Sequence, residues 1–231
     1  NPSSSFFDFS GSIEDGHKKN VDNALRRHAF ESQLADIAAL PVSEQTAALQ
    51  NFAFKENSPD QLTTRELMRL FTAFNERRAF SDMMLLVDTC RNYNFFSSPA
   101  VIESYLAACN RTGEYNKVLE VEKNSKNWKS NNALTSTVYG AFGKAWFKKH
   151  SIAKQCSASK NENIIEAYKN SFPNDPDLAQ VESNAVFCLQ RSKENYEKGF
   201  LMNFEYYPGI NTVYTMMDLG EYAHAQNVAR M

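Results

Sequence analysis

The chain has 231 residues, 42% of them hydrophobic and 13% aromatic, and 25 Lys and Arg against 27 Asp and Glu leave a net charge of −2. This length can bury about 70% of the unfolded surface, the 17 Phe and 10 Tyr exclude a disordered chain, and the near-neutral charge gives no overall field for polyanions or membrane surfaces. Only 8 Gly and 7 Pro argue against an all-β chain and a Gly-rich phosphate-binding enzyme, so the composition favours helices.

The N-terminal residues 1–12 show no helical period, and we expect a flexible tail there, followed by a single helical-repeat domain over residues 13–231. Over residues 13–40, apolar side chains recur at steps of three to five, which predicts one helix that Pro41 ends. Its predicted apolar stripe consists of Val21, Leu25, Ala29, Leu34 and Ile37.

Capping residues then predict the starts of three further helices. Ser43 is expected to cap a helix that stops at residues 57–59, and Thr63 or Thr64 to cap the next. Pro99 is placed to open a later one, because Pro is favoured at the first helical position. The inward side chains predicted for this region are Leu67, Leu70, Phe71, Phe74, Met83, Leu86, Val87, Ile102, Tyr105, Leu106 and Cys109.

A helix–turn–helix unit recurs in this part of the sequence. Phe80 opens the second helix of one unit and Tyr115 that of the next, 35 residues later, and each is followed after three residues by an apolar residue, Met83 or Val118. Such a period is typical of tetratricopeptide and pentatricopeptide arrays. Because a single hairpin cannot bury both its faces, the units must stack.

The downstream sequence continues the helical pattern. The predicted helices are 133–148, 163–172, 177–189, 194–202, 208–219 and 221–231. The frame between residues 133 and 172 stays open, because His150 and Ala153 also fit the repeat spacing. Tyr222 matches Tyr115 after 107 residues, close to three repeat lengths. We therefore expect an all-α, right-handed solenoid of about six tetratricopeptide-like hairpins that continues past residue 231.

The C-terminal third carries a family resemblance. Residues 196–200, followed by 206–211 and 219–220, resemble the signature of the tetratricopeptide-type TRAFs-binding domain of apoptosis-signal-regulating MAP kinase kinase kinases and related bacterial proteins. In that family an aromatic-Pro-Gly-Ile-Asn turn joins one hairpin to the next, which implies that Pro208 fixes a first turn and Gly209 permits close backbone approach. The resemblance implies a scaffold that binds proteins and has no enzymatic activity.

Earlier hairpins depart from the tetratricopeptide consensus. Leu106 stands where a small residue is usual, and Glu122 stands where an aromatic is common.

No cofactor, metal or catalytic site is expected. The four Cys lack metal-ligand spacing and are predicted to be buried free thiols, which fits a reducing compartment. The four His form no metal-binding pattern, and no nucleophile-elbow or phosphate-cradle motif occurs. No apolar run reaches the roughly 18 residues of a membrane span. An enzyme site assembled from distant residues stays open. The expected location is the cytoplasm, of the source cell or of a host cell if the protein is a delivered bacterial effector.

The expected partner is a protein or peptide held on the concave face of the solenoid. The residues chosen for this contact are Asn75, Glu103, Asn110, Trp128 and Tyr214. The repeat phase places further residues near the same face, namely Met68, Thr72, Ala107, Phe142, Ile210 and Met217, of which Phe142 and Met217 can equally be core. Trp128 is either an exposed anchor or a cap over the repeat.

The alternative partner is single-stranded RNA, since pentatricopeptide arrays share the period. Nucleic acid is not the expected partner, because the basic runs at residues 17–19, 26–28, 77–78 and 148–150 fall at different helix ends among acidic residues.

Overall fold

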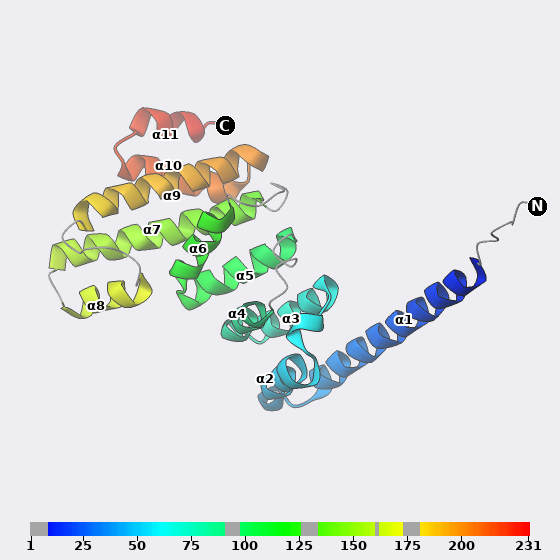
Figure 1. The fold of residues 1–231 in the computed structure, drawn as a ribbon. Coiled ribbons are helices and arrows are strands. Elements are labelled where there is room, and N and C mark those ends of the chain that lie inside the picture. The colour runs from blue at the N-terminus through cyan, green and yellow to red at the C-terminus, as the bar shows by residue number, and fades with distance from the viewer. Residues whose placement is uncertain (1–8, 91–97, 126–133, 160–161, 173–180) are drawn as a thin grey trace, which may run out of the picture. The chain divides into compact units, whose positions relative to one another are not determined.

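The structure is a computed structural model (Figure 1). It describes residues 9–90, 98–125, 134–159, 162–172 and 181–231, and every regular element within these ranges is helical. The α-helices are α1 (Phe9–Ala39), α2 (Val42–Asn51), α3 (Thr64–Glu76), α4 (Phe80–Thr89), α5 (Pro99–Thr112), α6 (Tyr115–Ser125), α7 (Ser136–Ser159), α8 (Glu162–Ser171), α9 (Val181–Asn203), α10 (Tyr206–Asp218) and α11 (Tyr222–Val228). The predicted all-α class is confirmed for these residues.

The chain divides into two compact units, Asn1–Asn57 and Ser58–Met231. This division differs from the expected single domain over residues 13–231. Its boundary falls where the backbone leaves a π-helical turn, Phe52–Glu56, and becomes extended at Asn57 and Ser58.

The first unit contains α1 and α2. α1 begins at Phe9, so residues 9–12 of the expected tail are helical. Phe30 is buried, and its ring centroid lies 5.1 Å from that of Phe52 in the π-helical turn. The predicted stripe of α1 is wrong in its first half, because Val21 and Leu25 are 55% and 64% exposed.

The expected cap of α2 is also wrong. The N-cap residue is Pro41, and no side chain caps the helix. Instead, the Gln45 amide donates to the carbonyl oxygens of Ala38 and Leu40, at 3.0 and 2.8 Å, and so satisfies carbonyl groups where α1 ends.

Among the described residues of the second unit, one turn with the same closing hydrogen bond occurs three times. Each turn has a residue with positive φ, one further residue, and then the aromatic residue that opens the second helix of a hairpin. The positive-φ residues are Arg78, Gly113 and Gly220, and the aromatic residues are Phe80, Tyr115 and Tyr222. The spacing found in the sequence is confirmed, because all three aromatic residues begin a helix. Phe204–Tyr206 also combines a positive φ with an aromatic helix start, but there the Phe204 N–H donates to the Phe200 carbonyl, four residues back.

A backbone hydrogen bond from an N–H group to the carbonyl five residues earlier closes each of the three turns. The backbone N–H groups of Ala79, Glu114 and Glu221 donate to the carbonyls of Phe74, Cys109 and Met216, each at 2.9 Å. At such helix ends a residue in the left-handed conformation turns the backbone, so that a following N–H group can bond to a carbonyl of the last helical turn. The hairpins α3–α4, α5–α6 and α10–α11 are therefore three copies of one local structure.

Side-chain contacts tie the first two hairpins together. Tyr105 of α5 donates to Asp88 Oδ1 of α4 at 2.9 Å, and Lys117 of α6 pairs with Asp88 Oδ2. The Asp88 carboxylate thus joins three consecutive helices, α4, α5 and α6.

Thr63 and Glu66 form a reciprocal capping box that sets the start of α3.

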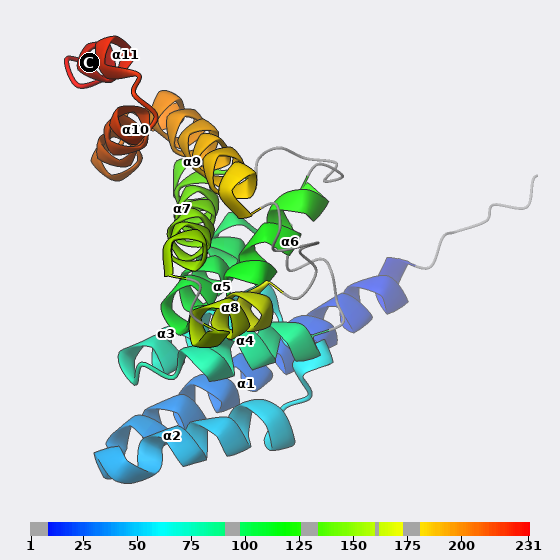
Figure 2. The ribbon, with the colours of Figure 1, turned by 90° about the vertical axis from the view of Figure 1, so that its left-hand side faces the viewer.

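Between the second and third hairpins, α7 and α9 lie side by side in opposite directions (Figures 1 and 2). Three hydrogen bonds fix their register. They run from Ser136 Oγ to the Gly199 carbonyl at 2.8 Å, from Ser192 Oγ to the Gly143 carbonyl at 2.9 Å, and between His150 Nδ1 and the Ala185 carbonyl at 2.8 Å. Each step is seven residues on both helices, so the same faces stay in contact along the pair.

This pair corrects two predicted breaks. Residues 177–189 and 194–202 were predicted as two helices, but α9 is continuous from Val181 to Asn203. Likewise α7 runs eleven residues past Lys148, the predicted end. No Gly or Pro interrupts residues 190–193, and the polar Ser192 among them is buried and bonded to α7. The two helices therefore depart from the short-hairpin pattern.

Glycines allow α9 and α10 to approach their neighbours. Gly209 was expected in a turn between hairpins, but it lies inside α10. A Cβ atom there would meet the Phe200 ring of α9 at 2.8 Å. The expected close approach is thus present, as a helix–helix contact. Asn211, in the same segment, donates to the Tyr207 carbonyl at 2.7 Å.

Candidate functional site

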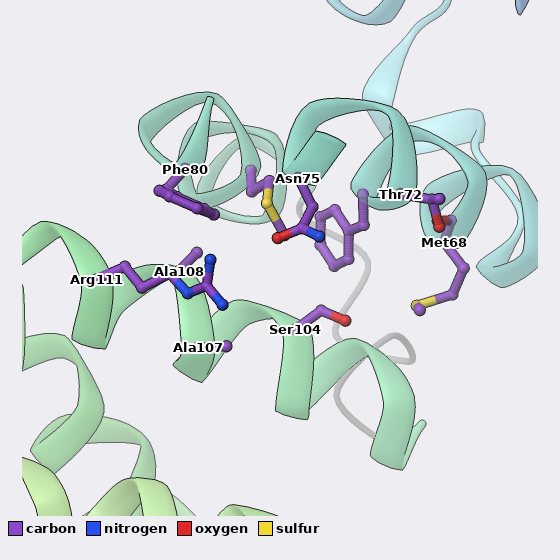
Figure 3. Close-up of a pocket in the computed structure, with 10 residues that line it drawn as sticks. Met68, Thr72, Asn75, Phe80, Ser104, Ala107, Ala108 and Arg111 are labelled. Atoms are coloured by element: carbon purple, nitrogen blue, oxygen red, sulfur yellow. The ribbon is translucent and has the colours of Figure 1, made fainter. Parts of the chain in front are cut away.

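A groove lies between α5 and the α3–α4 hairpin in the second unit, and Figure 3 shows its walls. Its volume is about 210 Å³. Met68, Phe71, Phe80 and Met83 supply the apolar lining, Thr72, Asn75, Ser104 and Arg111 the polar lining, and Ala107 and Ala108 the small side chains of α5. Both first helices, α3 and α5, contribute, so the groove occupies the face where the repeat phase predicts a binding surface.

Arg111 is the charged residue in this lining. It belongs to the last turn of α5, and its side chain reaches into the space between α5 and the α3–α4 hairpin (Figure 3). The guanidinium carbon lies 4.7 Å from the centroid of the Phe80 ring. A cation stacked on an aromatic face in this way is attracted by the ring and keeps its charge available to solvent.

The predicted site residues fall in different places. Asn75 is exposed and lines the groove, together with the expected Met68, Thr72 and Ala107. Tyr214 is 58% exposed on α10, outside the groove lining. Trp128 lies outside the described residues.

Glu103 and Asn110 lie on the side of α5 that faces α7. The Thr135 hydroxyl donates to Glu103 Oε1 at 2.5 Å, and Asn110 Nδ2 donates to the Ala141 carbonyl at 3.2 Å. These two residues are seven apart and share one stripe of α5, whereas residues 104, 107 and 111 form the neighbouring stripe that lines the groove. Glu103 and Asn110, predicted on the concave face, therefore lie beside the groove lining and contact Thr135 and α7.

Lysines of α7 lie close to Arg111. Lys144 is half-buried, and burial lowers the pKa of its ammonium group, with further lowering by the positive charges of Lys148 and Arg111. None of these three cations forms an ion pair within the part of the chain that the structure describes. The sequence reasoning missed Arg111 and Lys144. Extending the stripe from Ala107 by one turn would have found Arg111.

The basic run at residues 148–150 does not present one positive surface. Lys148 is exposed, but Lys149 is buried, with its ammonium nitrogen 5.4 Å from the Trp146 ring centroid and 4.9 Å from that of Phe172. His150 contacts the Ala185 carbonyl. The three side chains therefore enter three different environments.

A larger cavity of about 620 Å³ lies among α6, α7 and α9. Glu122, buried in its wall, accepts hydrogen bonds at Oε1 from Arg191 at 2.7 Å and from Asn195 at 2.9 Å, and at Oε2 from the Trp146 indole. Arg191 also donates to Glu194 at 2.7 Å. These polar groups are engaged with one another, and they fasten α6 to the α7–α9 pair.

The cysteines behave as predicted, since Cys90, Cys109, Cys156 and Cys188 are all free and buried. Burial raises the pKa of Cys90 to about 11 and that of Cys109 to about 12. Among the residues that the structure describes, no group of three or more His, Cys, Asp or Glu side chains is placed to hold a metal ion. No helix in these residues is long and apolar enough to cross a membrane.

The chain matches no protein-family model, and comparisons with curated proteins and with solved structures find no similar protein.

Proposed function

We propose that this protein is a non-catalytic interaction module, a right-handed solenoid of tetratricopeptide-like hairpins that binds a segment of another protein in the groove between α3 and α5. The observation that carries the proposal is the groove itself. It is formed by the first helices of two consecutive hairpins, α3 and α5, together with Phe80 and Met83 of α4, and the two hairpins share the same closing turn. The resemblance of residues 196–220 to the TRAFs-binding domain supports the same class of function.

The size and lining of the groove favour a peptide. Small-molecule sites usually enclose about 300–1,000 Å³, whereas about 210 Å³ suits one or two side chains of a longer segment. Apolar side chains form one part of the lining, and the exposed Thr72 and Asn75 offer hydrogen bonds at its edge. Such a combination anchors an apolar side chain and orients the backbone around it.

The experiment is a selection of random peptides displayed on phage, followed by binding of the enriched peptides to a variant with a filled groove. Ala107 is exposed and lines the groove, so Ala107→Trp places an indole where the peptide is proposed to bind. The matched control is Ala223→Trp on the exposed surface of α11. We expect Ala107→Trp to weaken binding at least tenfold and the control to leave it unchanged. Equal binding by both variants would refute the proposal.

A further inference from the structure

The cations beside the groove define the chemistry of the partner. We propose that the bound segment is acidic: it places an apolar side chain in the groove and carboxylate side chains against Arg111, Lys144 and Lys148. This inference rests on the proposed function and specifies the partner of the same site.

The helix contacts bring the three cations to one place. Asn110 donates to the Ala141 carbonyl, which holds the last turn of α5 against α7. Arg111 follows Asn110 directly, and Lys144 is one turn beyond Ala141 on the same face of α7. Lys148 is one turn further along that face. A positive surface therefore leads from the groove onto α7.

The electrostatic state of this surface favours an anion. Burial, and then the charges of Lys148 and Arg111, lower the pKa of Lys144, so the cations repel one another. Arg111 interacts with the Phe80 ring and has no carboxylate partner within the described residues. Carboxylates placed among the three cations would replace this repulsion with attraction.

The spacing of the lysines also matches an extended peptide. Lys144 and Lys148 are four residues apart, which is about 6 Å along a helix. In an extended chain, side chains two residues apart lie on the same side and are separated by about 6.6 Å. The proposed segment therefore carries Asp or Glu at alternate positions after its apolar residue.

The lining favours a peptide over single-stranded nucleic acid. A base needs an open aromatic face for stacking, and Arg111 lies over the face of Phe80. The remaining wall of Met68, Phe71 and Met83 suits an aliphatic or aromatic side chain. The experiment described next also tests whether the chain binds single-stranded nucleic acid.

The test uses the whole chain and the random twelve-residue peptides enriched by the phage selection, synthesised with a fluorescein label. Each peptide is also made with Gln in place of Glu and Asn in place of Asp. Binding is measured to Lys144→Gln, Lys148→Gln, Arg111→Gln and the charge-preserving Arg111→Lys. Lys154→Gln, which changes an exposed lysine further along α7, is the matched control.

We expect the enriched peptides to combine an apolar residue with alternating Asp or Glu. Each neutralising variant should weaken binding about two- to fivefold, while Arg111→Lys and Lys154→Gln should change it little. Affinity should also fall between about 0.1 and 1 M salt, as the screening length falls from about 10 to 3 Å.

Two results overturn the inference and leave the proposed function standing. In one, Ala107→Trp blocks the peptides but their amide versions bind equally well. In the other, Ala107→Trp blocks the peptides but the lysine variants have no effect. If no enriched peptide is blocked by Ala107→Trp, the proposed function fails and the inference fails with it. If a labelled oligo-uridine binds the chain, competes with the peptides and binds more weakly to Lys144→Gln and Lys148→Gln, the partner is a nucleic acid and the inference is wrong.

Discussion

Replacing Glu122 by Gln should destabilise the second unit, because this carboxylate is the centre of the contact between α6 and the α7–α9 pair. Its two oxygens both face N–H donors: Oε1 faces Arg191 and Asn195, and Oε2 faces Trp146. A Gln side chain has the same shape, but in either orientation its NH₂ group meets at least one of these donors.

The magnitude follows from the bonds lost. A hydrogen bond to a charged group contributes about 1.5–3 kcal/mol, and leaving a buried donor unpaired costs a similar amount. Arg191 keeps its bond to Glu194, so its charge is not left alone. We therefore expect Glu122→Gln to lower the free energy of unfolding by about 2–3 kcal/mol. Glu120→Gln, on the exposed side of the same helix, should cost under about 0.5 kcal/mol.

The assay is urea unfolding followed by tryptophan fluorescence, because both Trp residues fall within Ser58–Met231. With a slope of about 2 kcal/mol per molar urea, the midpoint should fall by about 1–1.5 M. A midpoint for Glu122→Gln equal to that of Glu120→Gln would refute the idea that this network holds α6 in place.

Three further predictions concern packing, turns and pH. Gly143→Ala and Gly209→Ala should each destabilise the second unit by about 1–3 kcal/mol in the same assay, because the new Cβ atoms meet the Tyr196 and Phe200 rings at 2.8 Å; unchanged midpoints would contradict the close helix contacts. A Cβ atom at Gly113 or Gly220 would meet no atom within 4 Å, but φ is +85° and +79°, so each Gly→Ala change should lower the free energy of unfolding by about 1 kcal/mol. Arg78→Gly, at φ 55°, should not lower it. A loss of stability in Arg78→Gly would mean that the three turns are not equivalent. Burial raises the pKa of Cys109 to about 12, well above that of an unfolded thiol near 8.5. The contribution of the protonated thiol to the free energy of unfolding is therefore complete below about pH 8.5 and is lost as the pH rises toward 12. The free energy of unfolding should fall over this window, less steeply in Cys109→Ser, and equal slopes in both proteins would contradict the burial of that thiol.

The local repeat could be read from the sequence because it depends on neighbouring residues. A left-handed residue, one further residue and an aromatic helix start lie within three positions, and the apolar residue three positions later is buried in each copy, as Met83, Val118 and Ala225 show. Helix starts with their own chemical signal, such as Thr63 with its capping box and Pro99, could also be found from the sequence.

The α7–α9 pair could not be predicted in the same way. Its register depends on Ser136, Ser192 and His150 bonding to carbonyls tens of residues away. Its closeness depends on Gly143 opposite the Tyr196 ring and on Gly199 opposite the Ser136 carbonyl. Nothing close to these residues in the sequence indicates which distant carbonyl or ring each of them meets.

The candidate site was predicted in part for a related reason. The repeat phase identifies which stripe of α3 is exposed, so Asn75 and Thr72 could be placed. It does not show that the neighbouring stripe of α5, with Glu103 and Asn110, contacts Thr135 and α7. Lys144 becomes a candidate only when that contact brings α7 beside Arg111.

The most direct test of the account is the dissociation constant of one enriched peptide, measured by fluorescence anisotropy with the wild-type chain and with Ala107→Trp. We predict at least a tenfold weaker affinity for Ala107→Trp, with Ala223→Trp equal to wild type. Equal dissociation constants for all three proteins would contradict the claim that the groove between α3 and α5 is the binding site.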